Sequence, residues 1–384
     1  MKQSKKIAIF TGYFLPFLGG IERYTDHLAT HLEKFGYEVI IVTSNHDSLI
    51  TEERKPHHIY RLPIYSLFSK RYPIPKKNNI YKEIIKKLES ENISAVVCNT
   101  RFHLTSLIGS KFAKKKQIPV LVIEHGSSHF TVNNKVLDFF GAIYEHLLTN
   151  HLKKFVSNFY GVSEKCNVWL KHFKIDAKGT FYNSIDKNAY KNFNDKHYLA
   201  NREEKIVITY AGRIIKEKGI IELLEAYQNI VSKYKNTILV VAGDGPILEK
   251  LKQDYDNKNI KFVDKLDYNS VMALYNDTDI FVYPSMYPEG LPTSILEAGI
   301  MKCAIIATDR GGTKEVINDK KYGIIVEESI NSIQKQLSYL LKNKEIVDDM
   351  KENIHNRVMQ SFTWDVTTKK VANELEVMIN GKKS

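Results

Sequence analysis

The chain has 384 residues, 43% of them hydrophobic, and this length exceeds what one hydrophobic core usually serves, so we expect two domains. Its contents of 19 glycines and 10 prolines exclude collagenous and low-complexity proteins. Three cysteines, far apart and odd in number, exclude a disulfide framework and a zinc–cysteine cluster. We expect these thiols to be buried and the protein to be cytoplasmic.

The formal net charge of +12 lies entirely in the first half of the chain. Residues 1–190 carry 28 Lys and Arg against 16 Asp and Glu, whereas residues 191–384 carry 28 of each. The segment Arg54–Lys87 alone holds ten basic residues. Such a segment attracts the phosphates of nucleic acid or of an anionic membrane, and an ordinary solvated surface is the alternative interpretation.

The first apolar run, Ile7–Leu18, follows several lysines, as the core of a signal peptide does. No cleavage site follows it, however, and Thr11, Gly12 and Pro16 interrupt it. We therefore expect a strand and a loop here. No stretch has the roughly 18 to 20 apolar residues of a membrane-spanning helix, so any contact with a membrane is expected at its surface.

Short β-branched runs alternate with amphipathic segments, which indicates βαβ units and parallel sheets. In the first half we expect strands at Ile7–Phe10, Val39–Val42, Ala95–Cys98, Val120–Ile123 and Phe159–Val162. Apolar residues from Ile21 to Phe35 recur at helical spacing between the first two strands, and Gly36 ends that helix. In the second half we expect strands at Ile206–Ala211, Thr237–Ala242, Ile260–Val263, Ile280–Tyr283, Ala304–Ala307 and Gly323–Val326.

The fold class is therefore α/β, with two doubly wound, Rossmann-like domains. The polar, strand-free stretch Asn183–Glu204 separates the two halves. We place an N-terminal domain at residues 1–190 and a C-terminal domain at residues 191–361. The last segment, about 362–384, is expected to form a long helix with Trp364, Val371, Leu375 and Met378 on one face.

Open α/β sheets bind ligands beyond the carboxyl ends of their strands, so the candidate site residues are sought there. After the first strand, Gly19 and Gly20 precede a helix whose N-terminus suits an anion. After the fourth strand, His125 is placed to donate to a ligand oxygen or to titrate near neutrality. Simple turn chemistry is the alternative for the glycines, and His129 is interpreted as an ordinary loop residue.

In the second half, Arg213 and Lys218 follow the first strand and head a helix, where two cations fit a diphosphate. Gly243 follows the next strand and opens another helix. The most specific stretch is Pro284–Ala298, in which Glu289 and Glu297 flank a helix start. One carboxylate suits sugar hydroxyls, the helix N-terminus suits phosphate, and the second carboxylate suits a ribose diol.

Together these motifs resemble glycosyltransferase family 4, with the GT-B fold, over nearly the whole chain. The likeness is carried by Gly-Gly-Ile-Glu-Arg at 19–23, Glu-His-Gly at 124–126, Gly-Arg and Lys-Gly within 212–219, Gly-Asp-Gly-Pro at 243–246, and the pair Glu289 and Glu297. The resemblance implies two Rossmann-like domains facing across a cleft. It also implies that the N-terminal domain binds the acceptor, that the C-terminal domain binds the nucleotide sugar, and that the last helix crosses back to the N-terminal domain.

The resemblance further implies the role of each site residue. Arg213 and Lys218 would hold the diphosphate, Glu289 the hydroxyls of the transferred sugar, and Glu297 the ribose, while His125 would lie beside the reacting sugar. The remaining expected donor contacts come from the loops: Gly19, Gly20, Gly243, Leu291, Pro292 and Thr293.

The family generally retains anomeric configuration and needs no metal, so we expect a retaining transferase with no cofactor besides its donor. A UDP-sugar is favoured as donor and a GDP-sugar comes next. The stretch Asp277-Thr278-Asp279 matches the metal-binding Asp-x-Asp of another glycosyltransferase fold. It precedes a strand, at the end opposite the ligand, so Asp277 and Asp279 are interpreted as turn residues.

The acceptor is expected to be a glycan or a polyprenyl-linked molecule of bacterial surface polysaccharide synthesis. The segment Val136–Leu148 has too many apolar residues for one buried face, and Lys153 and Lys154 follow it. This helix and the basic segment either dock on an anionic membrane, or the helix is buried between the sheet and a neighbour. A nucleotide-sugar epimerase and a non-catalytic sugar-nucleotide-binding protein remain alternatives, whereas no motif for nucleic acid is found.

Overall fold

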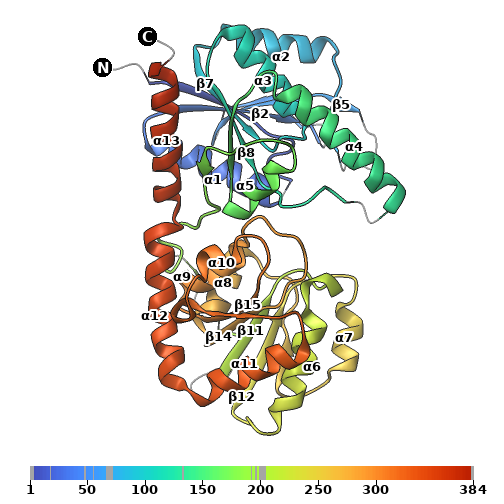
Figure 1. Cartoon of the computed structure of the whole chain (residues 1–384), viewed down its shortest axis with the longest axis vertical. Helices are drawn as coiled ribbons and strands as arrows, with labels where there is room; N and C mark the ends of the chain where they lie inside the picture. Colours follow the sequence, from blue (N-terminus) through green and yellow to red (C-terminus); the bar gives the residue numbers. More distant parts are fainter. Residues whose placement is uncertain are drawn as a thin grey trace. The chain divides into compact units, whose positions relative to one another are not determined.

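Figure 1 shows the computed structural model of the chain, which describes residues 4–17, 19–46, 49–54, 56–65, 72–131, 134–191, 193–194, 197–198 and 205–381. The chain divides by its internal contacts into two compact units. Unit 1 comprises Met1–Tyr182 together with Trp364–Ser384, and unit 2 comprises Asn183–Thr363. The C-terminal segment therefore belongs to the N-terminal unit, as expected.

Residues 183–190, placed in the first domain from the sequence, belong to unit 2. The reason is backbone pairing that the polar composition of this segment does not reveal. The Ile185 N–H donates to the Phe362 carbonyl at 2.9 Å, and Ile185 forms a parallel bridge with Thr363. The Asn183 side-chain amide donates to the Leu291 carbonyl at 2.8 Å.

Unit 1 is built on an eight-stranded sheet with the order β10-β9-β8-β7-β1-β2-β4-β3. The strands are β1 (Lys6–Phe10), β2 (Glu38–Ser44), β3 (Glu52–Glu53), β4 (His58–Leu62), β7 (Ile93–Asn99), β8 (Val120–Glu124), β9 (Asn158–Gly161) and β10 (Gly179–Thr180). All neighbouring strands are parallel except β3 and β4. The five strands expected from the sequence are β1, β2, β7, β8 and β9, and a separate antiparallel pair joins β5 (Ile64–Tyr65) to β6 (Ile74–Pro75).

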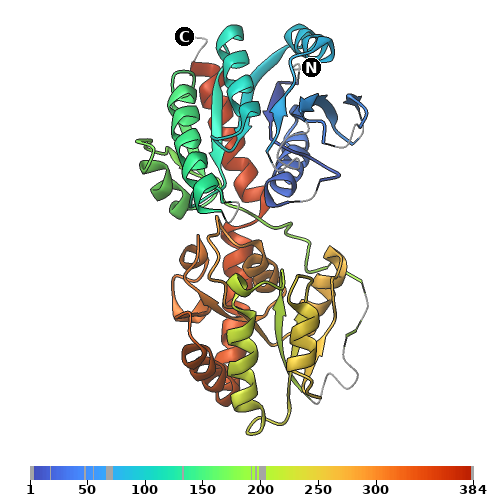
Figure 2. The same ribbon diagram turned by 90° about the vertical axis from the view of Figure 1, so that its right-hand side faces the viewer.

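Helices cover both faces of this sheet. They are α1 (Gly20–Lys34), α2 (Asn79–Ser90), α3 (Leu104–Lys116), α4 (Lys135–Leu152), α5 (Glu164–Lys171) and α13 (Trp364–Gly381). Ile7 and Ile9 of β1 point into a core shared with α1 and α13, whereas Ala8 and Phe10 point into a core with α2 and α3. The helices α1 and α13 pack against each other (Figures 1 and 2).

Unit 2 contains a six-stranded, fully parallel sheet with the order β13-β12-β11-β14-β15-β16. The strands are β11 (Ile206–Ala211), β12 (Thr237–Ala242), β13 (Ile260–Phe262), β14 (Ile280–Tyr283), β15 (Ala304–Thr308) and β16 (Ile324–Val326), so all six expected strands are present. The helices are α6 (Ile220–Val231), α7 (Leu248–Asp254), α8 (Tyr268–Asn276), α9 (Thr293–Ile300), α10 (Thr313–Val316), α11 (Ile330–Lys342) and α12 (Lys344–Ser361). The apolar faces of α6, α7, α11 and the first half of α12 form one core with the sheet. Cys98, Cys166 and Cys303 are buried, as expected, and none of the three forms a disulfide.

Candidate functional site

The loops that follow β11, β12 and β14 are joined by backbone hydrogen bonds at the carboxyl edge of the unit 2 sheet. The Gly212 N–H donates to the Ala242 carbonyl at 3.0 Å, and the Met286 N–H donates to the Glu217 carbonyl at 2.9 Å. This edge is where a parallel α/β sheet binds its ligands. The predicted donor residues of unit 2 are therefore carried by neighbouring loops.

At two points these loops approach each other so closely that only glycine fits. Gly219 has a φ of +70°, and a Cβ atom there would lie 2.0 Å from the Pro284 carbonyl oxygen. Gly243 has a φ of +146°, and a Cβ atom there would lie 1.8 Å from the Gly212 carbonyl oxygen. Gly243, predicted as a donor contact, thus has a packing role that brings the loops together.

Lys218 forms a largely buried polar cluster with Glu289 and Tyr283. The Lys218 side chain is 10% exposed, that of Glu289 is 19% exposed, and Lys218 Nζ forms an ion pair with Glu289 Oε1. Lys218 Nζ also donates to the Tyr283 hydroxyl oxygen at 3.1 Å, and this hydroxyl donates to Glu289 Oε1 at 2.7 Å. Burial, followed by the nearby Glu289 charge, raises the pKa of Tyr283 well above its ordinary value, so the phenol stays a neutral donor.

Arg213 lies beside the same cluster and is exposed. Its guanidinium carbon lies 5.6 Å from the centre of the Tyr287 ring, and Lys218 Nζ lies 5.1 Å from that ring. The structure therefore groups the two predicted cations around one aromatic side chain. Tyr283 and Tyr287 were not identified as site residues from the sequence. Tyr283 ends a strand and Tyr287 lies in a loop with prolines and a glycine, and neither position has a distinctive spacing.

The helix α9 begins beside this cluster. Pro292 is its N-cap residue, and no side chain caps it, although Thr293 and Ser294 have suitable hydroxyls. Thr293 is exposed, Leu291 and Pro292 are buried, and Glu297 is half-buried in the second turn. The first-turn N–H groups of α9 thus provide a partial positive charge at the carboxyl edge of the sheet.

In unit 1, the N-terminus of α1 carries the predicted pair Gly19 and Gly20. Gly19 is the N-cap residue, and the carboxylate of Glu22, three residues later, accepts its backbone N–H. This is one half of a capping box, because glycine has no side chain that could accept the N–H of Glu22 in return. A Cβ atom on Gly19 would lie 2.3 Å from Glu22 Oε2, whereas a Cβ atom on Gly20 would meet no atom within 4 Å. The open side of this turn is therefore at Gly20.

His125 lies just after β8 and is held by a chain of hydrogen bonds. The Thr25 hydroxyl donates to the Ile21 carbonyl at 2.8 Å, so its oxygen accepts from Asn99 Nδ2 at 2.7 Å. Asn99 Oδ1 is then left to accept from His125 Nε2 at 3.1 Å. Burial lowers the pKa of His125 to about 3, so the expectation that it titrates near neutrality is wrong. The imidazole is neutral, with its proton on Nε2 and a lone pair on Nδ1.

Asn99 and Thr25 were not identified from the sequence. They lie on β7 and α1, far from His125 along the chain, and only the fold brings them together. The loop of His125 is also fastened by Glu124, whose Oε1 accepts the N–H groups of His125 at 3.2 Å and of Gly126 at 3.0 Å.

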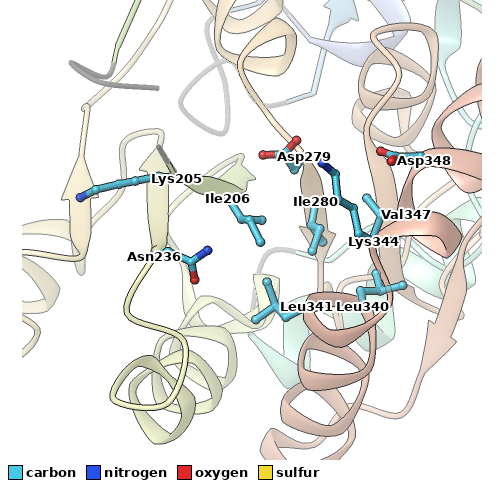
Figure 3. Close-up of a pocket in the computed structure, with 10 residues that line it drawn as sticks. All are labelled: Lys205, Ile206, Asn236, Asp279, Ile280, Leu340, Leu341, Lys344, Val347 and Asp348. Atoms are coloured by element: carbon cyan, nitrogen blue, oxygen red, sulfur yellow. The ribbon is translucent and has the colours of Figure 1, made fainter. Parts of the chain in front are cut away.

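A cavity of about 300 Å³ lies at the opposite edge of the unit 2 sheet, where β11 and β14 begin (Figure 3). Asp279 lines it, accepting from the Val207 N–H at 2.9 Å and from Lys351 Nζ at 2.7 Å. Asp277 contacts His197 Nδ1 at 3.2 Å. Both carboxylates therefore hold local structure, in agreement with their interpretation as turn residues.

The basic segment Arg54–Lys87 is not one free cationic surface, and the expectation of a single patch needs correction. Arg61 is buried and pairs with Glu53 at 2.8 Å. Arg54 and Lys87 both pair with Glu52, each at 2.6 Å. The exposed lysines of the segment, not paired in this way, are Lys76, Lys77, Lys82 and Lys86. Lys55, Lys70 and Arg71 lie outside the described residues.

The helix α4 has an exposed apolar face. Val136, Leu137, Phe139, Phe140 and Leu147 are 57–65% exposed, whereas Glu145, Leu148, Thr149 and Leu152 face the protein. The alternative prediction, that the whole helix is buried between the sheet and a neighbour, is therefore wrong. Within the described ranges, no helix combines the length and apolar character required to span a bilayer.

Comparison with known proteins agrees with this architecture. Residues 18–188 match the family described as Glycosyltransferase Family 4, and residues 192–357 match the family described as Glycosyl transferases group 1. The chain is 27% identical over 389 residues to a protein of Methanocaldococcus jannaschii named as an uncharacterized glycosyltransferase, covering 98% of this chain and 99% of the relative. It is 26% identical over 380 residues to the alpha-monoglucosyldiacylglycerol synthase of Acholeplasma laidlawii, covering 91% of each.

Among solved structures, Anabaena HepE in complex with UDP-glucose has a TM-score of 0.72 at 14% sequence identity, covering 97% of this chain and 99% of that one. This likeness shows the fold. The two parallel sheets, the return of α13 to unit 1 and the two family matches lead to one conclusion: the chain is a GT-B glycosyltransferase and belongs to glycosyltransferase family 4.

Proposed function

We propose that this enzyme transfers a sugar from a nucleoside-diphosphate sugar to a hydroxyl of a glycan or lipid-linked acceptor, with retention of anomeric configuration. Unit 2 would bind the donor and unit 1 the acceptor. The observation that carries the donor assignment is the cluster of Lys218, Glu289 and Tyr283 beside Arg213. UDP-glucose in the HepE structure supports a UDP-sugar ahead of a GDP-sugar.

The cations of unit 2 would stabilise the departing nucleotide. Breaking the sugar–phosphate bond builds negative charge on the diphosphate, and fixed positive groups favour that state. Arg213 supplies a planar fork and Lys218 a point charge, next to the N-terminus of α9. We therefore assign diphosphate binding to these groups, without a metal ion. By analogy with single oxyanion donors, losing one would raise the barrier by roughly 2.7–4 kcal/mol.

In the proposed step, the bond from the anomeric carbon to the phosphate oxygen breaks, and the acceptor oxygen bonds to that carbon on the same face. The acceptor proton passes to a phosphate oxygen. Glu289 is held by Lys218 and Tyr283, which suits binding of sugar hydroxyls better than nucleophilic attack. His125, neutral because of its lowered pKa, would hydrogen-bond to the sugar instead of delivering a proton.

We place the acceptor at the cytoplasmic surface of a membrane, in the synthesis of a bacterial surface polysaccharide. The exposed apolar face of α4 supports contact with lipid. Lys135 at the start of α4 and Lys154 just beyond its end add positive charge that favours anionic headgroups. The relatives include a synthase named for a glucosylated diacylglycerol and a capsular polysaccharide glycosyltransferase of Staphylococcus aureus.

The test of the donor site is the thermal stability of the full chain with UDP, GDP, ADP or CMP, in EDTA and in magnesium. A nucleotide at about 100 times its dissociation constant adds about 2.7 kcal/mol to the free energy of unfolding. We expect UDP to raise the midpoint in EDTA, and Lys218→Ala to abolish this rise. Lys216→Ala, an exposed lysine of the same loop, is the matched control and should keep it.

If UDP still raises the unfolding midpoint of Lys218→Ala, then Lys218 does not bind the diphosphate. A rise seen only with magnesium would contradict binding without metal. If none of the four nucleotides shifts the midpoint, the donor assignment itself is overturned.

A further inference from the structure

Three histidines that play no part in the proposed donor site meet on unit 1. His129 lies in the loop after β8, His146 on α4, and His172 at the C-terminal end of α5. One ring nitrogen from each lies within 4.8 Å of the others. The Nε2 atoms of His146 and His172 are 3.0 Å apart. Three separate elements thus direct imidazole rings to one point.

Aromatic packing fixes the orientation of these rings. The His172 ring stacks on Trp169, with centroids 4.8 Å apart and an angle of 6° between planes. The His129 ring meets the same Trp169 edge-on at 4.9 Å. The His146 ring lies 4.7 Å from the centre of Phe173. The arrangement is therefore held by packing, so that a ligand would meet rings already oriented.

Glu145 provides a carboxylate that orients His129. Glu145 Oε2 lies 3.2 Å from His129 Nδ1 and also accepts from Arg101 Nη2 at 2.7 Å. Its other oxygen accepts the Phe130 N–H at 2.8 Å. A carboxylate on one imidazole nitrogen leaves the second nitrogen for a metal, and histidines that bind metals commonly have such a partner.

The charges behind the histidines favour a cation. Arg101 pairs with both Glu124, at 3.0 Å, and Glu145, at 2.7 Å. The three side chains are 1%, 0% and 4% exposed, so two carboxylates and one guanidinium are withdrawn from water. A buried excess of negative charge is costly unless a positive group compensates it. A cation bound through His129 would supply that charge.

We propose that His129, His146 and His172 form a binding site for a divalent transition-metal ion, for which zinc is the best match. Three imidazoles with an open fourth position are a known zinc arrangement. Tetrahedral zinc, with Zn–N distances of 2.0–2.1 Å, holds its nitrogen ligands about 3.3 Å apart. The pair at 3.0 Å is close to this value, and the third nitrogen, within 4.8 Å of the others, would have to approach by up to about 1.5 Å. His172 is exposed, which gives the ion a path from solvent.

The bound ion would tie the loop between β8 and α4 to both α4 and α5. This site lies within unit 1, whereas the proposed diphosphate ligands lie on unit 2. The proposal is therefore independent of the proposed donor site.

The test is titration of the metal-free full chain with cobalt(II) and then zinc(II), in the absence of nucleotide. We expect one equivalent of cobalt(II) to give the visible absorption of a four-coordinate ion, and zinc(II) to displace it. His146→Gln and His172→Gln should each fail to bind this equivalent of cobalt(II). His151→Gln changes a histidine of α4 outside the cluster and should keep it.

Far-UV circular dichroism and the melting temperature without metal establish that each variant is folded. Zinc should raise the melting temperature of the wild type and of His151→Gln, but not of the other two variants. The proposal is overturned if the wild type binds no equivalent of cobalt(II), or if the two cluster variants bind as the wild type does.

Discussion

At the scale of single residues, Glu22 is a carboxyl in an unusual electrostatic position. It is 6% exposed, and burial raises the pKa of its carboxyl to about 7 even though it accepts the backbone N–H of Gly19. The sequence shows a Glu near two glycines but not its burial, which arises from the packing of α1 against the sheet. An ionised Glu22 would also repel a phosphate at Gly20, so the protonation state of this carboxyl sets the charge of the turn.

This pKa leads to a prediction for stability. Between pH 4.5 and 7 the folded state binds the Glu22 proton more tightly than the unfolded state, so the free energy of unfolding falls as the pH rises. Glu22→Gln cannot ionise but keeps an oxygen for the Gly19 N–H. Urea unfolding should show equal stability of variant and wild type below pH 4.5, and an advantage of about 3 kcal/mol for the variant at pH 8.

The difference in the free energy of unfolding between variant and wild type reports on Glu22 alone, because the other titrating groups are the same in both proteins. A difference that stays constant from pH 4 to pH 8 would mean that the carboxyl titrates normally in the folded protein.

At the scale of elements, α4 differs from the other helices of unit 1 because large apolar side chains cover its outer face. We expect the full chain to float with vesicles containing phosphatidylglycerol and not with neutral vesicles. Replacing Phe139 and Phe140 by Ser should weaken the partition roughly tenfold or more, because each ring loses its burial in lipid. Val377→Ser, which changes an exposed apolar residue of α13, should have no effect.

Equal flotation with neutral and anionic vesicles would argue against the role of the lysines. Unchanged flotation of the double variant would argue against the apolar face of α4.

The elements that the sequence predicted well are those whose pattern is set by local burial. The central strands β1, β7 and β11 are buried on both faces and read as continuous apolar runs. The strand β4 was missed, because His58 and Arg61 interrupt its apolar residues. Arg61 is nevertheless buried, since Glu53 and the Leu15 carbonyl satisfy its guanidinium. Such pairing depends on distant parts of the chain.

In the candidate site, too, residues in short motifs could be predicted, whereas residues that depend on distant parts of the chain could not. Lys218 and Glu289 lie in short motifs with recognisable spacing, and the structure joins them directly. Asn99, which fixes the proton of His125, lies at the end of an ordinary apolar strand and has no such motif. His129 was interpreted as an ordinary loop residue, because its partners come from α4 and α5 and not from its own loop.

At the scale of the whole molecule, α13 completes the core of unit 1. Leu375 is fully buried in the core that also contains Leu28 and Ile9. Leu375→Ala should lower the free energy of unfolding by about 2–5 kcal/mol, because it removes packed atoms and leaves a cavity. Val377→Ala on the same helix, 67% exposed, should change it little, and urea unfolding of the full chain measures both. Equal effects of the two changes would show that α13 is not packed as described.

The division of unit 1 along the chain also sets an order for folding during synthesis. All of unit 2 is translated before α13, so unit 2 is complete while the face of the first sheet that α13 covers still lacks its last helix. A nascent chain of residues 1–182 therefore lacks the helix that covers side chains such as Tyr24, whose ring packs edge-on against Trp364 of α13 at 5.0 Å. Chaperones that bind exposed apolar surface have their longest opportunity in this interval, and the N-terminal half, although made first, reaches its native state last.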